Sequence, residues 1–159
     1  MEYAWIRETD FPAFHELLEE YYREGEDENT AQEELDAFVR LLFDLVLQRK
    51  IAGCFAAEGA ALAGFALFAL DTEDFDFSEM PGYATILEIG LRRAYRGSGR
   101  GKELVSHAEA QLRQMGAESC YVSAYGPAQT FWKSCGYREI GKEASNGLPI
   151  LVKSLRAGA

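Results

Sequence analysis

Apolar and polar positions alternate along this chain with two different periods. Helical spacing, with apolar residues recurring every three or four positions, runs from Asp10 to Gly25 and from Thr30 to about residue 46. Another helix is expected at about 100–115, and Pro127 opens a short one that Gly136 ends. Short apolar runs predict strands at 3–7, 51–58, 61–70, 83–91, 119–124, 137–140 and 148–154. The predicted order is β-α-α-β-β-β-α-β-α-β-β, an α/β (α+β) fold with a mixed sheet.

Several local signals place the ends of these elements. Asp10 is a candidate N-cap for the first helix, with Pro12 in its first turn. The segment Thr30-Ala31-Gln32-Glu33 has the capping-box pattern and predicts the start of the second helix. Gly59 is expected to turn the chain between two antiparallel strands. Gly116 is expected to end the helix at about 100–115.

Composition adds size and charge to this picture. The 159 residues, 17.7 kDa and 48% hydrophobic content suit one compact domain over residues 1–159. The formal net charge of −10 is unevenly spread. Residues 1–91 carry 5 Lys/Arg against 21 Asp/Glu, whereas residues 92–159 carry 11 against 5. The acidic average argues against nucleic acid or an anionic membrane as a partner, yet the second part is basic.

Other classes are disfavoured by what the sequence contains. Three scattered cysteines, Cys54, Cys120 and Cys135, favour reduced thiols in the cytoplasm over a disulfide framework. Two histidines without a metal-ligand spacing make a metal site unexpected. The sequence shows neither a secretory leader pattern nor an apolar run of about 18 residues, so we expect a cytoplasmic protein that does not span a membrane.

A basic, glycine-rich turn stands between a predicted strand and a predicted helix. It contains the hexapeptide Arg96-Gly97-Ser98-Gly99-Arg100-Gly101, followed by Lys102. Glycines let backbone amides approach one anion closely, and the helix N-terminus adds favourable partial charge. The Walker A pattern and the dinucleotide fingerprint both require glycines or a hydroxyl at positions where this turn has other residues. A pyrophosphate cradle of another kind is therefore predicted.

The turn resembles the acyl-CoA pyrophosphate loop of the GNAT superfamily of N-acyltransferases, whose pattern is Gln/Arg-x-x-Gly-x-Gly/Ala. About 30 residues later, the segment Ala128 to Tyr137 resembles the family's second motif, a short helix that ends in Gly-Phe/Tyr. The two motifs extend the resemblance over roughly residues 50–155. It implies acetyl-CoA or a related acyl-CoA as cosubstrate, a primary amine as acceptor, and direct attack of the amine on the thioester without a metal.

The resemblance also implies roles for individual residues. Glu88 is the carboxylate on the strand before the turn. It is expected to act as the general base for the amine, or to relay the amine's proton through water. The backbone of Ile89 to Leu91 is expected to hold the pantetheine. The family usually has a tyrosine acid where this chain has Trp132, whose indole cannot give up a proton, so we expect Tyr125 to protonate the thiolate, with Cys135 or water as alternatives. The expected cofactor-binding residues are Ile89, Leu91, Arg96, Gly97, Ser98, Gly99, Arg100, Gly101, Lys102 and Trp132.

The sequence leaves the acceptor and the assembly open. The acidic segments 24–28 and 71–79 could form a negative mouth for a cationic amine, or be solvated loops. A non-catalytic acyl-CoA-binding or interaction module is the rival function, and a nucleotide-binding protein is a second. The resemblance allows a homodimer through the C-terminal strands.

Overall fold

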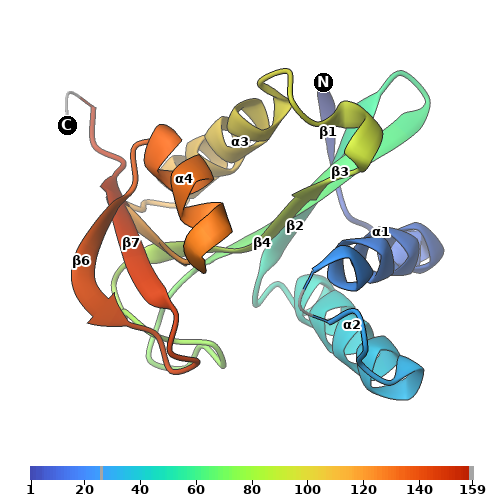
Figure 1. Cartoon of the computed structure of the whole chain (residues 1–159), viewed down its shortest axis with the longest axis horizontal. Helices are drawn as coiled ribbons and strands as arrows, with labels where there is room; N and C mark the ends of the chain where they lie inside the picture. Colours follow the sequence, from blue (N-terminus) through green and yellow to red (C-terminus); the bar gives the residue numbers. More distant parts are fainter. Residues whose placement is uncertain (26, 158–159) are drawn as a thin grey trace. The chain divides into compact units, whose positions relative to one another are not determined.

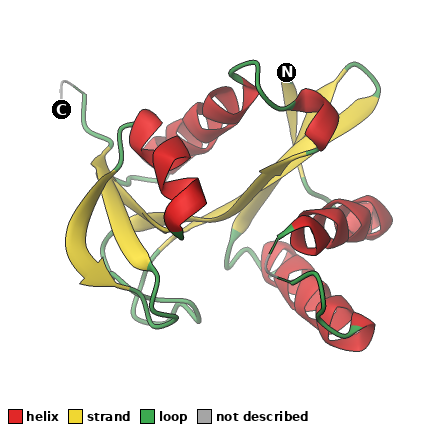
Figure 2. Cartoon of the chain, in the orientation of Figure 1, coloured by secondary structure: helices red, strands yellow, loops and turns green. Residues whose placement is uncertain are grey.

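A computed structural model describes residues 1–25 and 27–157, and the predicted order of elements is confirmed in it. The strands and helices follow one another as shown in Figure 1 and, by type, in Figure 2. They are β1 (Glu2–Trp5), α1 (Phe11–Glu24), α2 (Gln32–Leu47), β2 (Ala52–Glu58), β3 (Ala61–Leu70), β4 (Ala84–Leu91), α3 (Arg100–Gln114), β5 (Ser119–Ser123), α4 (Gly126–Ser134), β6 (Arg138–Glu143) and β7 (Pro149–Ser154).

The described strands form one seven-stranded sheet with the order β1-β2-β3-β4-β5-β7-β6. The pairs β1–β2, β5–β7 and β6–β7 are antiparallel. The pair β4–β5 is parallel, with Ala84 opposite Cys120 and Thr85 opposite Tyr121. The sheet is therefore mixed, as predicted.

The chain divides into two compact units. The first contains residues 1–67 and 88–101, and the second contains residues 68–87 and the chain from Lys102 onward. The strands β3 and β4 and the helix α3 each have residues in both units.

In the first unit, α1 and α2 pack against each other through aromatic rings. The Phe43 ring of α2 lies 5.0 Å from that of Phe11 and 5.2 Å from that of Phe14, both on α1. Tyr21, near the end of α1, packs its ring at right angles to Phe65 of β3, with 5.4 Å between ring centroids. The apolar positions that recur with helical spacing in the sequence therefore form the faces through which α1 and α2 contact each other.

In the second unit, a buried ion pair joins α3 to β7. The Lys153 ammonium of β7 lies 2.9 Å from the Glu109 carboxylate of α3, and the Tyr137 hydroxyl donates to the same carboxylate at 2.8 Å. Glu109 is 2% exposed, so both donors are needed to compensate for its burial. Gly136, at φ 97°, ends the turn after α4 and lets the chain enter β6, as its place in the sequence predicts.

The predicted capping box at Thr30 is wrong. The helix α2 begins at Gln32 with Ala31 in the N-cap position, and no side chain caps it. The Thr30 hydroxyl instead donates to the Asp27 carboxylate at 3.0 Å, because an acceptor three residues earlier competes for it. Similarly, Asp10 occupies the N-cap position of α1, but its carboxylate accepts from the backbone amide of Arg7 at 2.7 Å rather than from its own helix.

Candidate active site

The glycine turn has the backbone that an anion cradle needs. Gly97 and Gly99 have φ values of 85° and 83°, a region that side-chain-bearing residues rarely adopt. A Cβ at either position would meet nothing within 4 Å, so the turn is open. The helix α3 begins at Arg100. The amides of its first turn, including that of Gly101, therefore have no carbonyl partner within the helix. Successive amides and the helix N-terminus suit a phosphate group.

The arginine side chains of this turn are held by carboxylates of the same unit. The Arg96 guanidinium donates to the Leu91 carbonyl at 2.8 Å and lies 2.6 Å from the Glu24 carboxylate at the end of α1. The Arg100 guanidinium lies 2.6 Å from Glu58 of β2, and this contact is the main cause that lowers the pKa of Glu58. The positive charge predicted for phosphate binding is thus partly neutralised by carboxylates of residues that lie far away in the sequence.

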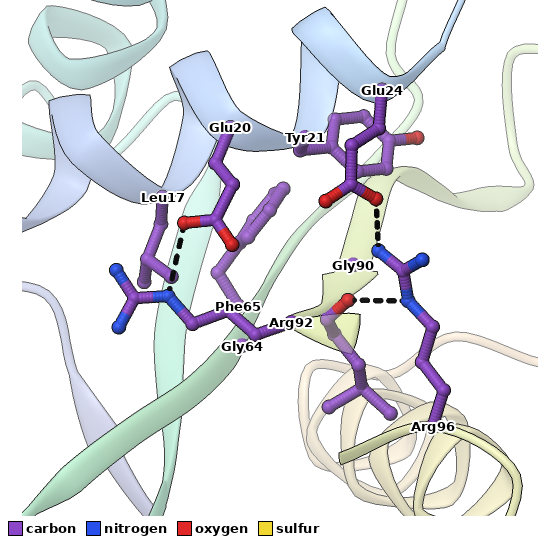
Figure 3. Close-up of a pocket in the computed structure, with 10 residues that line it drawn as sticks. Leu17, Glu20, Tyr21, Glu24, Gly64, Phe65, Gly90, Arg92 and Arg96 are labelled. Atoms are coloured by element: carbon purple, nitrogen blue, oxygen red, sulfur yellow. Dashed lines mark hydrogen bonds and ion pairs between the residues drawn. The ribbon is translucent and has the colours of Figure 1, made fainter. Parts of the chain in front are cut away.

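A pocket of about 220 Å³ of empty space, part of it open to solvent, lies in the first unit between the C-terminal half of α1, the first half of β3 and the end of β4. Figure 3 shows that ion pairs bridge two sides of it. Arg92 lies 3.2 Å from both Glu16 and Glu20, and Arg96 completes the second bridge to Glu24. These bridges were not predicted from the sequence, although Glu16, Glu20 and Glu24 recur every four residues on one helical face.

Glu88 is half-buried on β4 and is the most perturbed carboxyl near this pocket. Burial raises its pKa from 4.5 to about 7, and the Asp27 charge also raises it. Hydrogen bonding to the hydroxyl of Tyr21 lowers the pKa and opposes part of that effect. A carboxyl that loses its proton near pH 7 has the property that a general base requires.

Gly90 brings α1 close to β4 beside Glu88. A Cβ at Gly90 would lie 2.6 Å from Cδ1 of Tyr21 and 3.0 Å from Cε1 of Phe65, so only glycine fits without a shift. Side chains two residues apart on a strand share one face. Gly90 and Glu88 therefore lie on the face of β4 that α1 covers.

Three predicted site residues belong to the second unit. Tyr125 is the N-cap residue of α4 and is 43% exposed. Trp132 is 7% exposed, and its ring packs between those of Phe131 and Tyr137, with centroid distances of 5.4 and 5.1 Å. Lys102, exposed in the first turn of α3, also belongs to this unit. The structure thus groups Glu88, Ile89, Leu91 and residues 96–101 in the first unit, and the roles of all the predicted site residues stay predictions.

The two acidic segments have internal roles. Arg23 organises the turn after α1 by donating to the carbonyls of Asp27, Glu28 and Thr30 at 2.6 to 3.2 Å, while Glu26 lies outside the described residues. In the second segment Asp71 is 2% exposed and accepts from Tyr121 at 2.7 Å.

Asp71 and Glu79 connect the second acidic segment to its own unit. The Asp71 carboxylate also accepts from the backbone amides of Glu79 and Met80, at 2.9 and 2.8 Å. Burial raises the pKa of Asp71, but hydrogen bonds from Ser78, from Tyr121 and from these two amides outweigh it and hold the pKa below the usual value. Glu79 itself accepts from Ser145. At least two acids of this segment therefore stabilise a loop.

The described residues contain no group of three His, Cys, Asp or Glu side chains able to hold a metal ion. Within the same residues, every helix is too short or too polar to cross a membrane.

Comparisons with known proteins agree with this geometry. The model of the acetyltransferase (GNAT) family matches residues 11–137. Curated proteins gave no sequence match. Among solved structures, an acetyltransferase from Thermus thermophilus is 20% identical, with a TM-score of 0.73, and the match covers 96% of each chain.

Two further solved structures contain a cofactor. PaiA N-acetyltransferase from Thermoplasma acidophilum, in complex with coenzyme A, is 15% identical with a TM-score of 0.70, and the match covers 97% of this chain and 99% of that one. YncA from Salmonella typhimurium, with acetyl-CoA, is 14% identical with a TM-score of 0.72, and the match covers 100% of this chain and 96% of that one. Since the family match extends over most of the sequence, the chain belongs to the acetyltransferase (GNAT) family.

Proposed function

We propose that this protein transfers an acetyl group from acetyl-CoA to a primary amine by direct attack. The observation that carries the proposal is the Glu88 carboxyl, with its pKa of about 7, on the strand that leads to the glycine turn in the same unit. A base and an anion cradle on one short segment are what amine acylation by an acyl-CoA requires.

The glycine turn supports acetyl-CoA as cosubstrate. The backbone amides of residues 97–101 would hold its pyrophosphate, because Gly97 and Gly99 leave them open to an anion. The structures of PaiA with coenzyme A and of YncA with acetyl-CoA support the same assignment. Bound acetyl-CoA supplies the activated thioester. Ile89 and Leu91 would hold the pantetheine through their backbone.

The protein's own groups then manage two protons. An amine with a pKa of about 10 arrives mostly as ammonium, and Glu88 removes its proton before or during attack. Tyr125 is proposed as the donor to the departing thiolate, since the Trp132 indole cannot act as an acid. Tyr125→Phe tests this: a turnover and pH profile equal to those of the unchanged protein would assign the proton to another group.

One assay separates the proposed reaction from its rivals. Release of CoA from acetyl-CoA is measured against a panel of polyamines, aminoglycosides, amino acids and peptides, with Glu88→Gln alongside. Turnover that falls about 100-fold or more in Glu88→Gln supports the proposal. Thermal stabilisation by CoA without turnover on any amine would instead indicate a binding module. Stabilisation by ATP or NAD but not by CoA would indicate a nucleotide-binding protein.

The proposal extends to the setting of the reaction. Residues 1–159 would act as one domain, because β3, β4 and α3 each contribute to both units. Three free thiols, Cys54, Cys120 and Cys135, suit the reducing cytoplasm. The edge strand β6 is exposed along its length and offers unpaired backbone groups to a second copy, so a homodimer is proposed and light scattering tests it.

A further inference from the structure

The pocket in the first unit has an apolar floor and a rim of paired charges. Its charged lining residues are two glutamates of α1, Glu20 and Glu24, and two arginines that follow β4, Arg92 and Arg96. Figure 3 shows each glutamate facing one of the arginines. The floor includes the apolar side chains of Leu17, Phe65 and Leu91. Since the charges of the lining sum to zero, the rim matches neither a purely cationic nor a purely anionic ligand.

Arg92 keeps hydrogen-bond donors that its own contacts do not use. Its Nε lies 3.2 Å from Glu20, its Nη2 lies 3.2 Å from Glu16, and its Nη1 donates to the Leu62 carbonyl at 3.3 Å. A guanidinium has five N–H groups, and these contacts with described residues use three of them. One N–H group on each terminal nitrogen is therefore left for a further acceptor.

Arg96 has spare donors as well. Its Nε donates to the Leu91 carbonyl at 2.8 Å and its Nη2 donates to Glu24 at 2.6 Å, so these contacts with described residues do not use Nη1. The side chains in the two ion pairs are 27 to 45% exposed, so a ligand in the pocket can reach them. The planar fork of a guanidinium suits a carboxylate in particular.

The two glutamates provide acceptors on the same rim. Glu20 and Glu24 each contact an arginine through Oε2, and each has a second carboxylate oxygen that can accept from a cation. A ligand with both an ammonium and a carboxylate can therefore join the existing ion pairs without leaving a charge unpaired. A polyamine would place a second cation beside the arginines instead.

The pocket also lies beside the proposed base. Gly90 lines it and shares a face of β4 with Glu88, about 7 Å away along the strand. Arg92 continues the pairing of β4 in the other direction, because its amide donates to the Ala63 carbonyl of β3 at 2.7 Å. A carboxylate held by Arg92 therefore leaves the amine on the side toward Glu88.

We propose that this pocket receives the acceptor and selects an amine that has its own carboxylate, as in a free amino acid with an apolar side chain. The inference rests on the proposed acetyl transfer and names its acceptor class. Arg92 and Arg96 bind the carboxylate, Glu20 and Glu24 attract the ammonium, and the floor contacts the side chain. The empty space of about 220 Å³ is below the range of about 300–1,000 Å³ that drug-sized ligands need, which suits a molecule as small as an amino acid.

The reaction then converts the amino acid into its N-acetyl derivative. The amine nitrogen bonds to the acetyl carbonyl carbon, and the C–S bond of the thioester breaks. Of the two protons that the ammonium loses, one goes to the Glu88 carboxylate and the other ends on the sulfur of CoA. The carboxylate of the amino acid is unchanged and serves only in binding.

The first test measures binding to the full-length protein by calorimetry, without acetyl-CoA and near neutral pH. The probes are leucine, leucinamide, in which a neutral amide replaces the carboxylate, and 3-methylbutylamine, which lacks that group. Leucine should bind about tenfold more tightly than the other two, the effect of one partly exposed charge-assisted contact. Equal binding of all three, tighter binding of either amine, or no binding of leucine at millimolar concentration would overturn the proposal.

The second test compares Arg92→Gln with a matched control, Arg40→Gln. Arg40 forms an exposed ion pair with Asp44 at 3.1 Å on α2 and is not part of the pocket lining. Arg92→Gln should bind leucine about tenfold more weakly and the two amines at least as tightly, since Glu20 loses its arginine. Arg40→Gln should leave all three affinities unchanged. Equal weakening of all three probes in Arg92→Gln would contradict the proposal, and if this variant fails to fold, the comparison of probes on the unchanged protein decides.

Measuring acetylation separately distinguishes this proposal from the proposed reaction. Release of CoA from acetyl-CoA is followed with the same three compounds. Leucine that binds as expected without being acetylated would refute the reaction and support the ligand class of the pocket. Equal kcat/KM values for all three compounds would support the reaction and overturn selection by the pocket.

Discussion

Glu88→Gln should stabilise the protein relative to the unchanged protein, and this gain in the free energy of unfolding should be larger at alkaline pH than at acidic pH. Glutamine resembles the protonated carboxyl, so the substitution removes the cost of burying a charge beside α1. The pKa of Glu88 rises from 4.5 to about 7 on folding, and burial is the main cause. At about 1.4 kcal/mol per unit, this shift corresponds to about 3 kcal/mol, and partial exposure of the side chain reduces the expectation to about 2 kcal/mol.

The sign follows from which state holds the proton. Below about pH 4.5, Glu88 is protonated in both the folded and the unfolded chain, and its ionisation contributes nothing to stability. Between pH 4.5 and 7 the unfolded chain releases this proton while the folded protein keeps it, so stability falls as pH rises. Above pH 7 the full cost is present, and it is absent in Glu88→Gln.

The assay is urea unfolding of both proteins in half-unit steps from pH 4 to pH 8.5. The free energy of unfolding of the unchanged protein minus that of Glu88→Gln cancels the titration of all other groups. This difference should fall by about 2 kcal/mol, mostly between pH 4.5 and 7. A difference that stays constant across that window would show that Glu88 is not buried as a charge and would remove the main support for its role as base.

Three further substitutions test separate parts of the structure. Gly90→Ala should lower the free energy of unfolding by about 1–3 kcal/mol in urea unfolding, since the new Cβ would lie 2.6 Å from Cδ1 of Tyr21. Lys153→Met should lower it by about 3–5 kcal/mol, because it leaves Glu109 buried without its ion-pair partner. Gly97→Ala should cost about 1–2 kcal/mol, since its φ of 85° is strained with a Cβ, and should also reduce the thermal stabilisation by CoA.

Each of these substitutions has a matched control. Gly126→Ala adds a Cβ that meets nothing within 4 Å, so it should leave stability nearly unchanged. Glu118→Gln removes an ion pair whose side chains are both exposed, and we expect less than about 1 kcal/mol. Gly82→Ala, at φ 95° in another loop, should cost as much stability as the turn variant while keeping the response to CoA. A loss of stability in Gly126→Ala or Glu118→Gln equal to that of its test variant, or a loss of the response to CoA in Gly82→Ala equal to that of Gly97→Ala, would show that the stated cause is wrong.

Periodicity and glycine placement were enough to predict the element order. The helical stripes and strands come from burial patterns that local spacing records, and Gly59 and Gly116 take the positive φ values expected of turn and helix-end residues. The start of α2 was not predictable in the same way. The Thr30 hydroxyl had two acceptors within reach, and the choice between them depends on how the turn after α1 is folded.

The parts of the candidate site that consist of residues close together in the sequence could be predicted. The turn at 96–101 and Glu88 on the strand before it could be found from the hexapeptide and its context. The Glu24 and Glu58 partners of the two arginines lie 72 and 42 residues away in the sequence. Such pairings depend on tertiary packing, which a single sequence does not specify.

Holding Arg96 and Arg100 against carboxylates has a consequence for how an anionic cofactor reaches the turn. Each ion pair presents a dipole to solvent rather than a full positive charge, and the field of a dipole falls off quickly with distance. Attraction then acts through uncharged backbone amides at short range. Since salt screens long-range fields most, the rate of CoA association should change little with ionic strength, in contrast to a site built on free arginines.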